Sequence, residues 1–188
     1  MYYTSIPVVT ERPNSRRWDA PKLRELRKRM DSNTMSLEEV DQLAGELLDG
    51  EIVDLASDWL GNTVVQKLFE KCSPGPRFAM LERLSPHLAM VGIHKNGTWA
   101  AQKIIECVQT PEEIAVVCQN LRPYGPPLLL DQFGNYVVQS VHSRVLHIAK
   151  RLTVLQVLSS LRASSQRVRL RRDGGSVVGD CSRSLRCS

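Results

Sequence analysis

One hexapeptide occurs three times at a nearly constant spacing, and this repetition limits the folds that the chain can adopt. The copies are Gly61–Gln66 (GNTVVQ), Gly97–Gln102 (GTWAAQ) and Gly134–Gln139 (GNYVVQ). Successive first glycines are 36 and 37 residues apart. A period of this length is typical of solenoids, in which each repeat forms one supersecondary unit and stacks on its neighbours. The sequence therefore predicts a stacked-repeat protein.

Apolar residues around each hexapeptide recur at helical spacing and are separated by turn residues. In the first unit, for example, a short apolar stretch precedes Gly61, a longer one follows it, and the turn 73–76 (SPGP) leads into a third. Three short helices per unit are therefore predicted. In the second unit Ser85 and Thr110, each followed by a proline, predict helix starts.

The units cover residues 51–84, 85–121 and 122–142, and the last is incomplete. Three prolines and a glycine within residues 122–127 predict a shortened or bent first helix in this third unit.

Two further helices are predicted ahead of the units, within residues 19–50. The second should begin at the capping box formed by Ser36 and Glu39. The first is basic, and we interpret its cations as a solvated face in preference to a phosphate-binding one. These cations are Lys22, Arg24, Arg27, Lys28 and Arg29. Residues 1–18 show no sustained period and predict an irregular or disordered lead-in.

The net charge of +5 is concentrated at one end of the chain. Residues 143–188 hold ten basic and two acidic residues, whereas residues 61–142 are close to neutral. Any binding by the units must therefore come from specific contacts more than from a broad basic field. The Arg/Ser-rich stretch 143–188 has three interpretations. It could be a segment that binds RNA nonspecifically, or a disordered tail. It could also be sequence that does not belong to the natural protein, such as the product of an altered reading frame or a retained intron. The abrupt change in composition favours the third.

No pattern in the sequence predicts an enzyme, a cofactor, a metal site or a membrane segment. The five cysteines and four histidines lack metal-ligand spacing. There is no nucleophile–base set, paired carboxylates or phosphate-binding loop, and no apolar run approaches the length of a membrane span. The odd number of cysteines favours a reducing compartment. These observations predict a soluble, cytoplasmic protein that acts on no small-molecule substrate.

Each hexapeptide places a polar residue, a variable residue and a glutamine at positions i, i+1 and i+4. In a helix these three side chains project from one end of one face. Taken singly, Asn62 and Asn135 could be helix caps, and Trp99 and Tyr136 could be half-buried aromatics. Capping does not require a glutamine four residues later in all three copies, however. The pattern therefore indicates a ligand-binding face that repeats once per unit.

The pattern Gly-Asn-Tyr-Val-Val-Gln, recurring once per three-helix unit of about 36 residues, resembles the Pumilio (PUF) repeat of RNA-binding proteins. The resemblance is closest to fungal Pumilio-domain proteins with a reduced number of repeats and covers about residues 20–142. It implies an all-α solenoid of about three PUF-like repeats preceded by two helices. Full-length relatives have more repeats, so the chain looks like a fragment of such a protein or a shortened product of its gene.

The resemblance also implies a role for each position of the hexapeptide. The polar residue and the glutamine form a base-edge pair, which hydrogen-bonds the edge of one RNA base, and the residue between them is the stacking residue. Asn62 with Gln66, and Asn135 with Gln139, resemble the family's uracil pair. Thr98 with Gln102 resembles its adenine pair, although Cys or Ser is commoner than Thr. The stacking residues are Thr63, Trp99 and Tyr136. Antiparallel binding, as in the family, predicts 5′-UAU-3′.

The expected function is sequence-selective binding of single-stranded mRNA, in untranslated regions, for post-transcriptional regulation. The expected partners are this RNA and proteins of mRNA decay or translational repression. The alternative is an armadillo- or HEAT-like helical-repeat module that binds other proteins. In that case the Asn, Thr and Gln side chains would only form contacts along the stack.

Overall fold

A computed structural model describes residues 2–8, 18–48 and 51–173, with side chains described up to residue 154. All regular elements among these residues are helices, which confirms the predicted all-α class. The helices are α1 (Ala20–Asp31), α2 (Leu37–Leu48), α3 (Ile52–Ser57), α4 (Gly61–Lys71), α5 (Pro74–Leu84), α6 (Leu88–Gly92), α7 (Gly97–Cys107), α8 (Pro111–Leu121), α9 (Gly125–Leu130) and α10 (Gly134–Asp173), with 3-10 turns at Ser85–His87 and Arg122–Tyr124.

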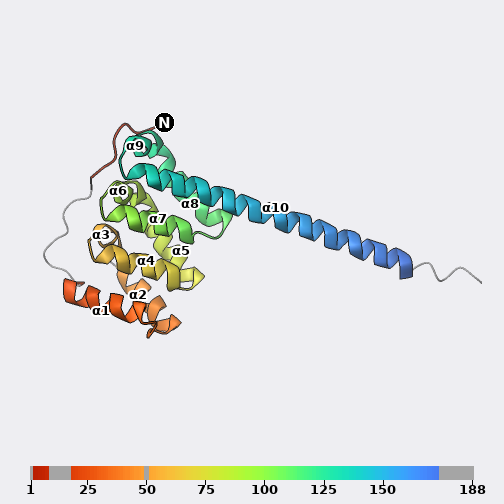
Figure 1. Ribbon diagram of the computed structural model, residues 1–188, viewed down its shortest axis with the longest axis horizontal. Coiled ribbons are helices and arrows are strands. Elements are labelled where there is room, and N and C mark those ends of the chain that lie inside the picture. Colours follow the sequence, from red (N-terminus) through yellow and green to blue (C-terminus); the bar gives the residue numbers. More distant parts are fainter. Residues whose placement is uncertain (1, 9–17, 49–50, 174–188) are drawn as a thin grey trace, which may run out of the picture. The chain divides into compact units, whose positions relative to one another are not determined.

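The helices form rows because each unit repeats the arrangement of the one before. Helix α1 packs on α4 and α4 packs on α7, and we call this series, with the first turns of α10, the inner row. Helices α2, α5 and α8 form a second row. The short helices α3, α6 and α9 each precede an inner-row helix. Figure 1 shows α1, α4, α7 and the start of α10 stacked in that order.

Local capping sets the beginnings of several helices where the sequence predicted them. The carboxylate of Asp19 accepts a hydrogen bond from Lys22 N at 3.1 Å, at the start of α1. Ser36 Oγ accepts from Glu39 N at 3.2 Å, while Ser36 N donates to Glu39 Oε2 at 2.8 Å, which completes the capping box of α2. Thr110 and Glu113 form the same box at α8.

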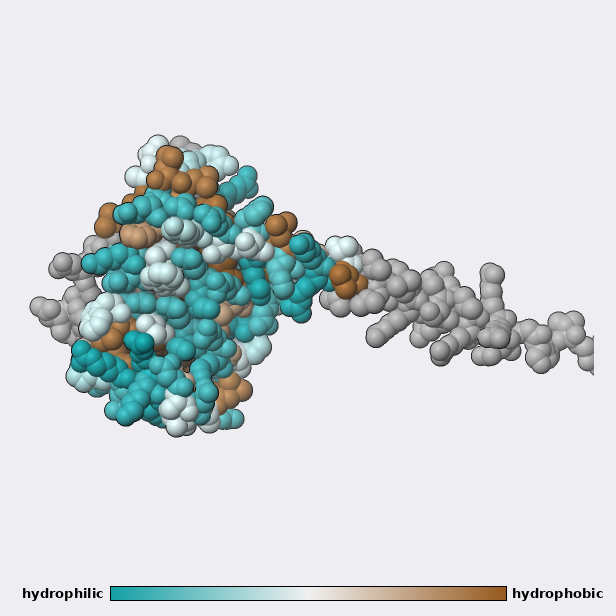
Figure 2. Space-filling model, in the orientation of Figure 1, coloured by the Kyte–Doolittle hydropathy of each residue, from teal (hydrophilic) through white to brown (hydrophobic). Residues whose placement is uncertain are grey.

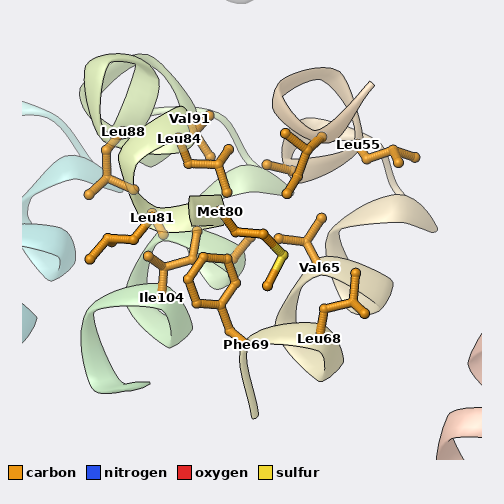
Figure 3. Close-up of a cluster of buried hydrophobic side chains, with 14 of the residues drawn as sticks. Leu55, Val65, Leu68, Phe69, Met80, Leu81, Leu84, Leu88, Val91 and Ile104 are labelled. Carbon is orange, nitrogen blue, oxygen red and sulfur yellow. The ribbon is translucent and has the colours of Figure 1, made fainter. Parts of the chain in front are cut away.

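The core lies between the two rows and is continuous from α1 to the first turns of α10. Figure 3 shows its centre, where Phe69 of α4 and Ile104 of α7 lie beside Met80, Leu81 and Leu84 of α5. All five side chains are at most 2% exposed. A buried ion pair between Arg77 and Glu113, with 3.5 Å between nitrogen and oxygen, joins α5 to α8. Because neighbouring units share this core, the inner-row helices are held in a fixed register.

The third unit is more regular at its start than the sequence predicted. The prolines at 126 and 127 occupy the first turn of α9, where a missing N–H breaks no helical hydrogen bond. Helix α9 has 6 residues, as many as α3, so a short first helix is the rule in all three units. In the second unit Ser85, expected to start a helix, lies in a 3-10 turn instead, and its hydroxyl donates to Leu81 O at 2.6 Å.

The chain is helical well beyond the last hexapeptide. The repeat pattern ends at His142, and a disordered tail was one of the three interpretations of residues 143–188, but α10 continues as a helix to Asp173. Residues 174–188 lie outside the described residues. The chain divides into residues 1–148 and 149–188, and all the candidate site residues belong to the first part.

Part of the lead-in is also held by contacts that its sequence did not predict. Tyr3 N donates to Pro123 O at 2.8 Å, and the rings of Tyr3 and Tyr124 lie 4.8 Å apart. Residues 2–8 have no helical or extended pairing of their own and lie near α9 (Figure 1). The remainder of the lead-in, residues 9–17, lies outside the described residues.

Candidate nucleic-acid interface

The three hexapeptides form the first turns of α4, α7 and α10, and one acceptor side chain fixes the start of each helix. The carboxylate of Asp58 accepts hydrogen bonds from Leu60 N and Gly61 N, both at 2.8 Å. Asp131 accepts from Phe133 N and Gly134 N at the same distance. These bonds satisfy backbone donors that have no partner within the helix.

In the second unit a histidine takes the place of the aspartate. His94 Nδ1 accepts from Asn96 N and Gly97 N, both at 3.3 Å. Burial, and to a smaller extent the charge of Lys95, lower the pKa of His94 below its ordinary value, which favours the neutral imidazole that can accept. This capping position was not singled out in the sequence, although it recurs at the same 36- and 37-residue spacing as the hexapeptide.

The glycine that opens each hexapeptide is required because it touches the backbone of the preceding short helix. A Cβ on Gly61 would lie 2.8 Å from Leu55 O, and one on Gly134 would lie 2.8 Å from Leu128 O. A Cβ on Gly97 would collide with the carbonyl oxygen of Val91. None of the described glycines has a positive φ, so the requirement is for space and not for an unusual backbone angle. Each inner-row helix is thereby fixed against its own short helix.

The amide base-edge pairs have the same geometry in the first and third units. Asn62 Nδ2 donates to Asp58 O at 2.7 Å and to Trp59 O at 3.0 Å, and Asn62 Oδ1 accepts from Gln66 Nε2 at 3.0 Å. Asn135 and Gln139 repeat the three bonds at 2.8, 3.1 and 3.1 Å. The asparagines therefore donate to the backbone, which differs from the capping alternative, in which they would accept from it.

In the second unit a hydroxyl replaces the asparagine oxygen. Gln102 Nε2 donates to Thr98 Oγ1 at 3.0 Å. Thr98 is as buried as Asn62, at 4% and 6% exposed respectively, so both lie at the base of the surface and their glutamines lie above them. All six predicted base-edge residues are thus brought onto the inner row as three hydrogen-bonded pairs.

The predicted stacking residues differ in exposure as they do in size. Trp99 is 64% exposed and Tyr136 is 51% exposed, so Trp99 lies mostly in solvent and Tyr136 is about half buried. Thr63 is partly buried. Figure 2 shows that the surface over the repeats is mostly hydrophilic in this view, with an apolar patch over α9, where Leu129 and Leu130 are exposed.

Ion pairs connect neighbouring inner-row helices within about one turn of the base-edge glutamines. Lys67 of α4 pairs with Asp31 of α1, and Lys103 of α7 pairs with Glu70 of α4, both at 3.2 Å. Lys103 also pairs with Glu106 at 2.8 Å, and these carboxylates, Glu106 foremost, raise its pKa. The cations are therefore neutralised within the row, in agreement with the near-neutral charge of the units.

This series of ion pairs is interrupted between α7 and α10, where a hollow opens. Ser140 and Ser143 stand 37 residues after Lys103 and Glu106, and their short side chains leave a pocket of about 440 Å³. It is lined by Gln102, Glu106, Tyr136, Gln139, Ser140, Ser143, Arg144 and His147. Gln102 of the second unit therefore opens into the same space as Tyr136 and Gln139 of the third.

The pocket includes five residues that sequence reasoning did not select, namely Glu106, Ser140, Ser143, Arg144 and His147. Arg144 is half-buried, and its Nε donates to the carbonyl oxygen of Val108. A guanidinium held in this way loses little freedom when its remaining N–H groups bind a ligand. Arg144 could have been found in the sequence from its position about two turns after Tyr136, which places both side chains on the same face of one helix.

The described residues contain no cluster of His, Cys, Asp or Glu that could hold a metal ion. Within the same part of the chain, no helix combines the length and apolarity required for crossing a bilayer. Burial raises the pKa of the Cys72 thiol to about 12, which identifies it as a core residue and not a reactive one.

Comparison with known proteins identifies the repeats. A family model described as a Pumilio-family RNA binding repeat matches residues 51–85, 87–121 and 128–141. The chain is 52% identical over 139 residues to a Pumilio domain-containing protein of Schizosaccharomyces pombe and 47% identical over 142 residues to the mRNA-binding protein PUF2 of Saccharomyces cerevisiae. Each match covers 74% of this chain and 13% of the relative, so the chain spans a small part of their length.

The fold matches as well. The crystal structure of the PUM-HD domain of S. pombe Puf1 in complex with RNA superposes with a TM-score of 0.68 at 48% identity, over 74% of this chain and 35% of that one. The Puf4 RNA binding domain bound to an RNA recognition sequence gives a TM-score of 0.61 at 35% identity, over 67% of this chain and 38% of that one. By these repeats and this fold, the chain belongs to the Pumilio family.

Proposed function

We propose that this chain binds single-stranded RNA and selects its sequence through the three base-edge pairs of the inner row. The observation that carries the proposal is the repeated hydrogen bond from each glutamine to Asn62, Thr98 or Asn135, at 3.0–3.1 Å in every unit. Three polar pairs held alike at a fixed spacing suit a ligand that is itself a regular polymer of flat polar groups. Single-stranded RNA with its bases unstacked is such a ligand.

The free hydrogen-bonding groups of the amide pair suit uracil. Both amide hydrogens of Asn62 are bound by the backbone, so its oxygen can contribute only a further acceptor site. Gln66 retains one N–H donor and its carbonyl oxygen. A uracil edge offers one N–H donor between two carbonyl acceptors. The N–H complements the acceptor oxygen of Asn62, and a carbonyl complements the free N–H of Gln66. We therefore assign uracil to the first and third units.

The second unit presents a smaller partner for its glutamine. The hydroxyl of Thr98 is shorter than an asparagine amide and leaves room for a purine above it. We assign adenine to this unit, which with antiparallel binding gives 5′-UAU-3′ from the third unit to the first. Trp99 and Tyr136 would contribute stacking of about 1–3 kcal/mol per base.

Three units should bind weakly. Their combined stacking and hydrogen bonding must offset an association cost of about 4–15 kcal/mol. The chain spans only part of its relatives, so we assign it a share of a longer RNA-binding surface. Its cellular role, in this proposal, is cytoplasmic control of mRNA stability or translation together with decay or repression proteins, without catalysis by the chain itself.

The test compares fluorescently labelled RNAs in which UAU, UGU or CCC is embedded in a neutral sequence, with binding followed by anisotropy. UAU should bind most tightly, and UGU should bind about 10-fold less tightly if one mispaired base costs about 1.4 kcal/mol. Equal affinity for UAU and UGU would contradict the adenine assignment. Absence of binding to all three RNAs would contradict RNA binding and favour a protein-binding repeat module.

A truncated chain separates base recognition from nonspecific attraction by the basic end of the protein. Truncation after Ile148 removes the Arg-rich residues and keeps every residue of the pocket. The preference for UAU over UGU should persist, while the affinity for all RNAs and its salt dependence should fall. Loss of the preference on truncation would contradict recognition by the repeats.

A further inference from the structure

An exposed tryptophan lies at the edge of the first unit, where no role has been assigned to it. Trp59 stands in the loop between α3 and α4 and is 61% exposed. The guanidinium of Arg24, from α1, lies over its ring, with Cζ 5.9 Å from the centroid. We propose that Arg24 and Trp59 form a fourth base-stacking site, for the nucleotide on the 3′ side of the base bound by the first unit. This inference rests on the proposed RNA-binding function.

Helix α1 lies where a preceding repeat would place its inner-row helix. It packs on α4 as α4 packs on α7. Its Asp31 pairs with Lys67 of α4, as Glu70 of α4 pairs with Lys103 of α7, each at 3.2 Å. The inner row therefore extends one helix beyond the three hexapeptides. RNA bound antiparallel to the chain would reach α1 with its 3′ end.

Trp59 is directly connected to the first base-edge pair. Its carbonyl oxygen accepts a hydrogen bond from Asn62 Nδ2 at 3.0 Å. The corresponding exposed positions in the next two units are Lys95 and Gln132, neither of which is aromatic. The first unit is also the one whose stacking residue, Thr63, has no ring. The aromatic surface missing at Thr63 is thus present four residues earlier and faces α1.

The chemistry of the pair suits a base and its phosphate. An indole and a guanidinium are both planar surfaces on which nucleobases stack. Among the described residues Arg24 forms no ion pair with a carboxylate, so its charge is available to a phosphate as well. A cation over an exposed ring contributes little to the protein's own stability. The arrangement leaves most of the tryptophan in contact with water until a ligand covers it.

The test uses two RNAs, 5′-CCCUAU-3′ and 5′-CCCUAUA-3′, which differ by one 3′ nucleotide. The wild-type chain should bind the longer RNA at least about 5-fold more tightly, since stacking of one base supplies about that factor or more. Trp59→Ala should abolish this gain while leaving the affinity for the shorter RNA unchanged, and Trp59→Phe should retain most of it. Lys95→Ala, at the matched position of the next unit, should keep the full gain.

A direct readout places 2-aminopurine at the added 3′ position. Stacking on Trp59 should quench its fluorescence on binding to the wild type, and Trp59→Ala should not quench it. The proposal would be overturned if the added 3′ nucleotide increased the affinity equally for the wild type and Trp59→Ala. It would also be overturned if the wild type showed neither an increase in affinity nor quenching. If the wild type bound the shorter RNA with no preference over 5′-CCCCCC-3′, the proposed function itself would fail, which is a separate result.

Discussion

Gln139 Nε2 lies 3.1 Å from Asn135 Oδ1, and this side-chain hydrogen bond has counterparts in the two preceding units. The asparagine is in turn tied to two backbone carbonyls of the loop before its helix. The position of the glutamine is therefore set before any ligand arrives. A site fixed in this way loses less conformational freedom on binding, so its hydrogen bonds contribute more to affinity.

Replacing Gln139 by alanine should lower the affinity for UAU-containing RNA about 10-fold. The substitution removes hydrogen bonds to one base and leaves the Asn135 oxygen without its partner, which together amount to about 1–2 kcal/mol. Titration of labelled RNA measures the effect. The control is Gln119→Ala, an exposed glutamine of α8 in the second row, which should bind like the wild type. Equal losses in both variants would contradict the assignment.

Thr98→Asn should change the preferred base of the second unit from adenine to uracil. The change recreates the amide pair of the first unit, whose asparagine fits a site of similar burial. Competition between UAU and UUU measures it, and we expect the preference to shift toward UUU by about 10-fold, because one base-edge pair discriminates by about 1–3 kcal/mol. Thr98→Ser keeps the hydroxyl and should keep UAU. An unchanged preference in Thr98→Asn would refute the role of this pair.

Gly97→Ala should destabilise the fold by about 2–3 kcal/mol, because the added methyl group would overlap the backbone of α6. Gly45→Ala is a control for which the opposite effect, stabilisation, is expected. Gly45 is exposed in the middle of α2, and a Cβ added there would meet nothing within 4 Å, so alanine should stabilise the helix by about 1 kcal/mol. Urea unfolding followed by circular dichroism measures both. Destabilisation of similar size in the two variants would show that the close approach at Gly97 is not the cause.

The free energy of unfolding should decrease as the pH falls below neutral, because His94 becomes protonated. The pKa of His94 is lower in the folded protein than its value of about 6.5 in the unfolded chain. The stabilisation from this cap is therefore complete above about pH 6.5 and is lost as the pH falls through the lower pKa of the folded protein. Protonation makes Nδ1 a donor, which breaks both bonds to the start of α7. His94→Asp recreates the cap of the other two units. Its melting temperature should decline less between about pH 7 and pH 5 than that of the wild type, and an identical decline would contradict the role of His94.

The parts of the fold that were predicted from sequence depend on contacts within one unit. The capping box at Ser36 and the helix start at Thr110 were predicted because the residues that signal them lie within three positions along the chain. The positions of the base-edge residues followed from the period of the hexapeptide. Both kinds of signal are local or repeated, so a single sequence contains them in full.

The parts that were not predicted depend on contacts between units or on the absence of a side chain. Arg24 meets Trp59 only because α1 packs on α4, and no spacing in the sequence indicates that contact. The pocket arises because Ser140 replaces the lysine of the earlier units, which becomes apparent only once α7 and α10 are aligned. The continuation of α10 past His142 was missed because the hexapeptide period ends there and the composition changes.

The contacts of Gly61, Gly97 and Gly134 with the short helices have a consequence for how such a surface can change over time. Backbone atoms, and not the base-edge side chains, determine where each inner-row helix begins. If these side chains read bases as we propose, a substitution at Asn62, Thr98 or Asn135 alters the preference of one unit without moving its neighbours. Under this proposal, single substitutions give access to new target sequences, while the spacing between the bound bases is inherited unchanged.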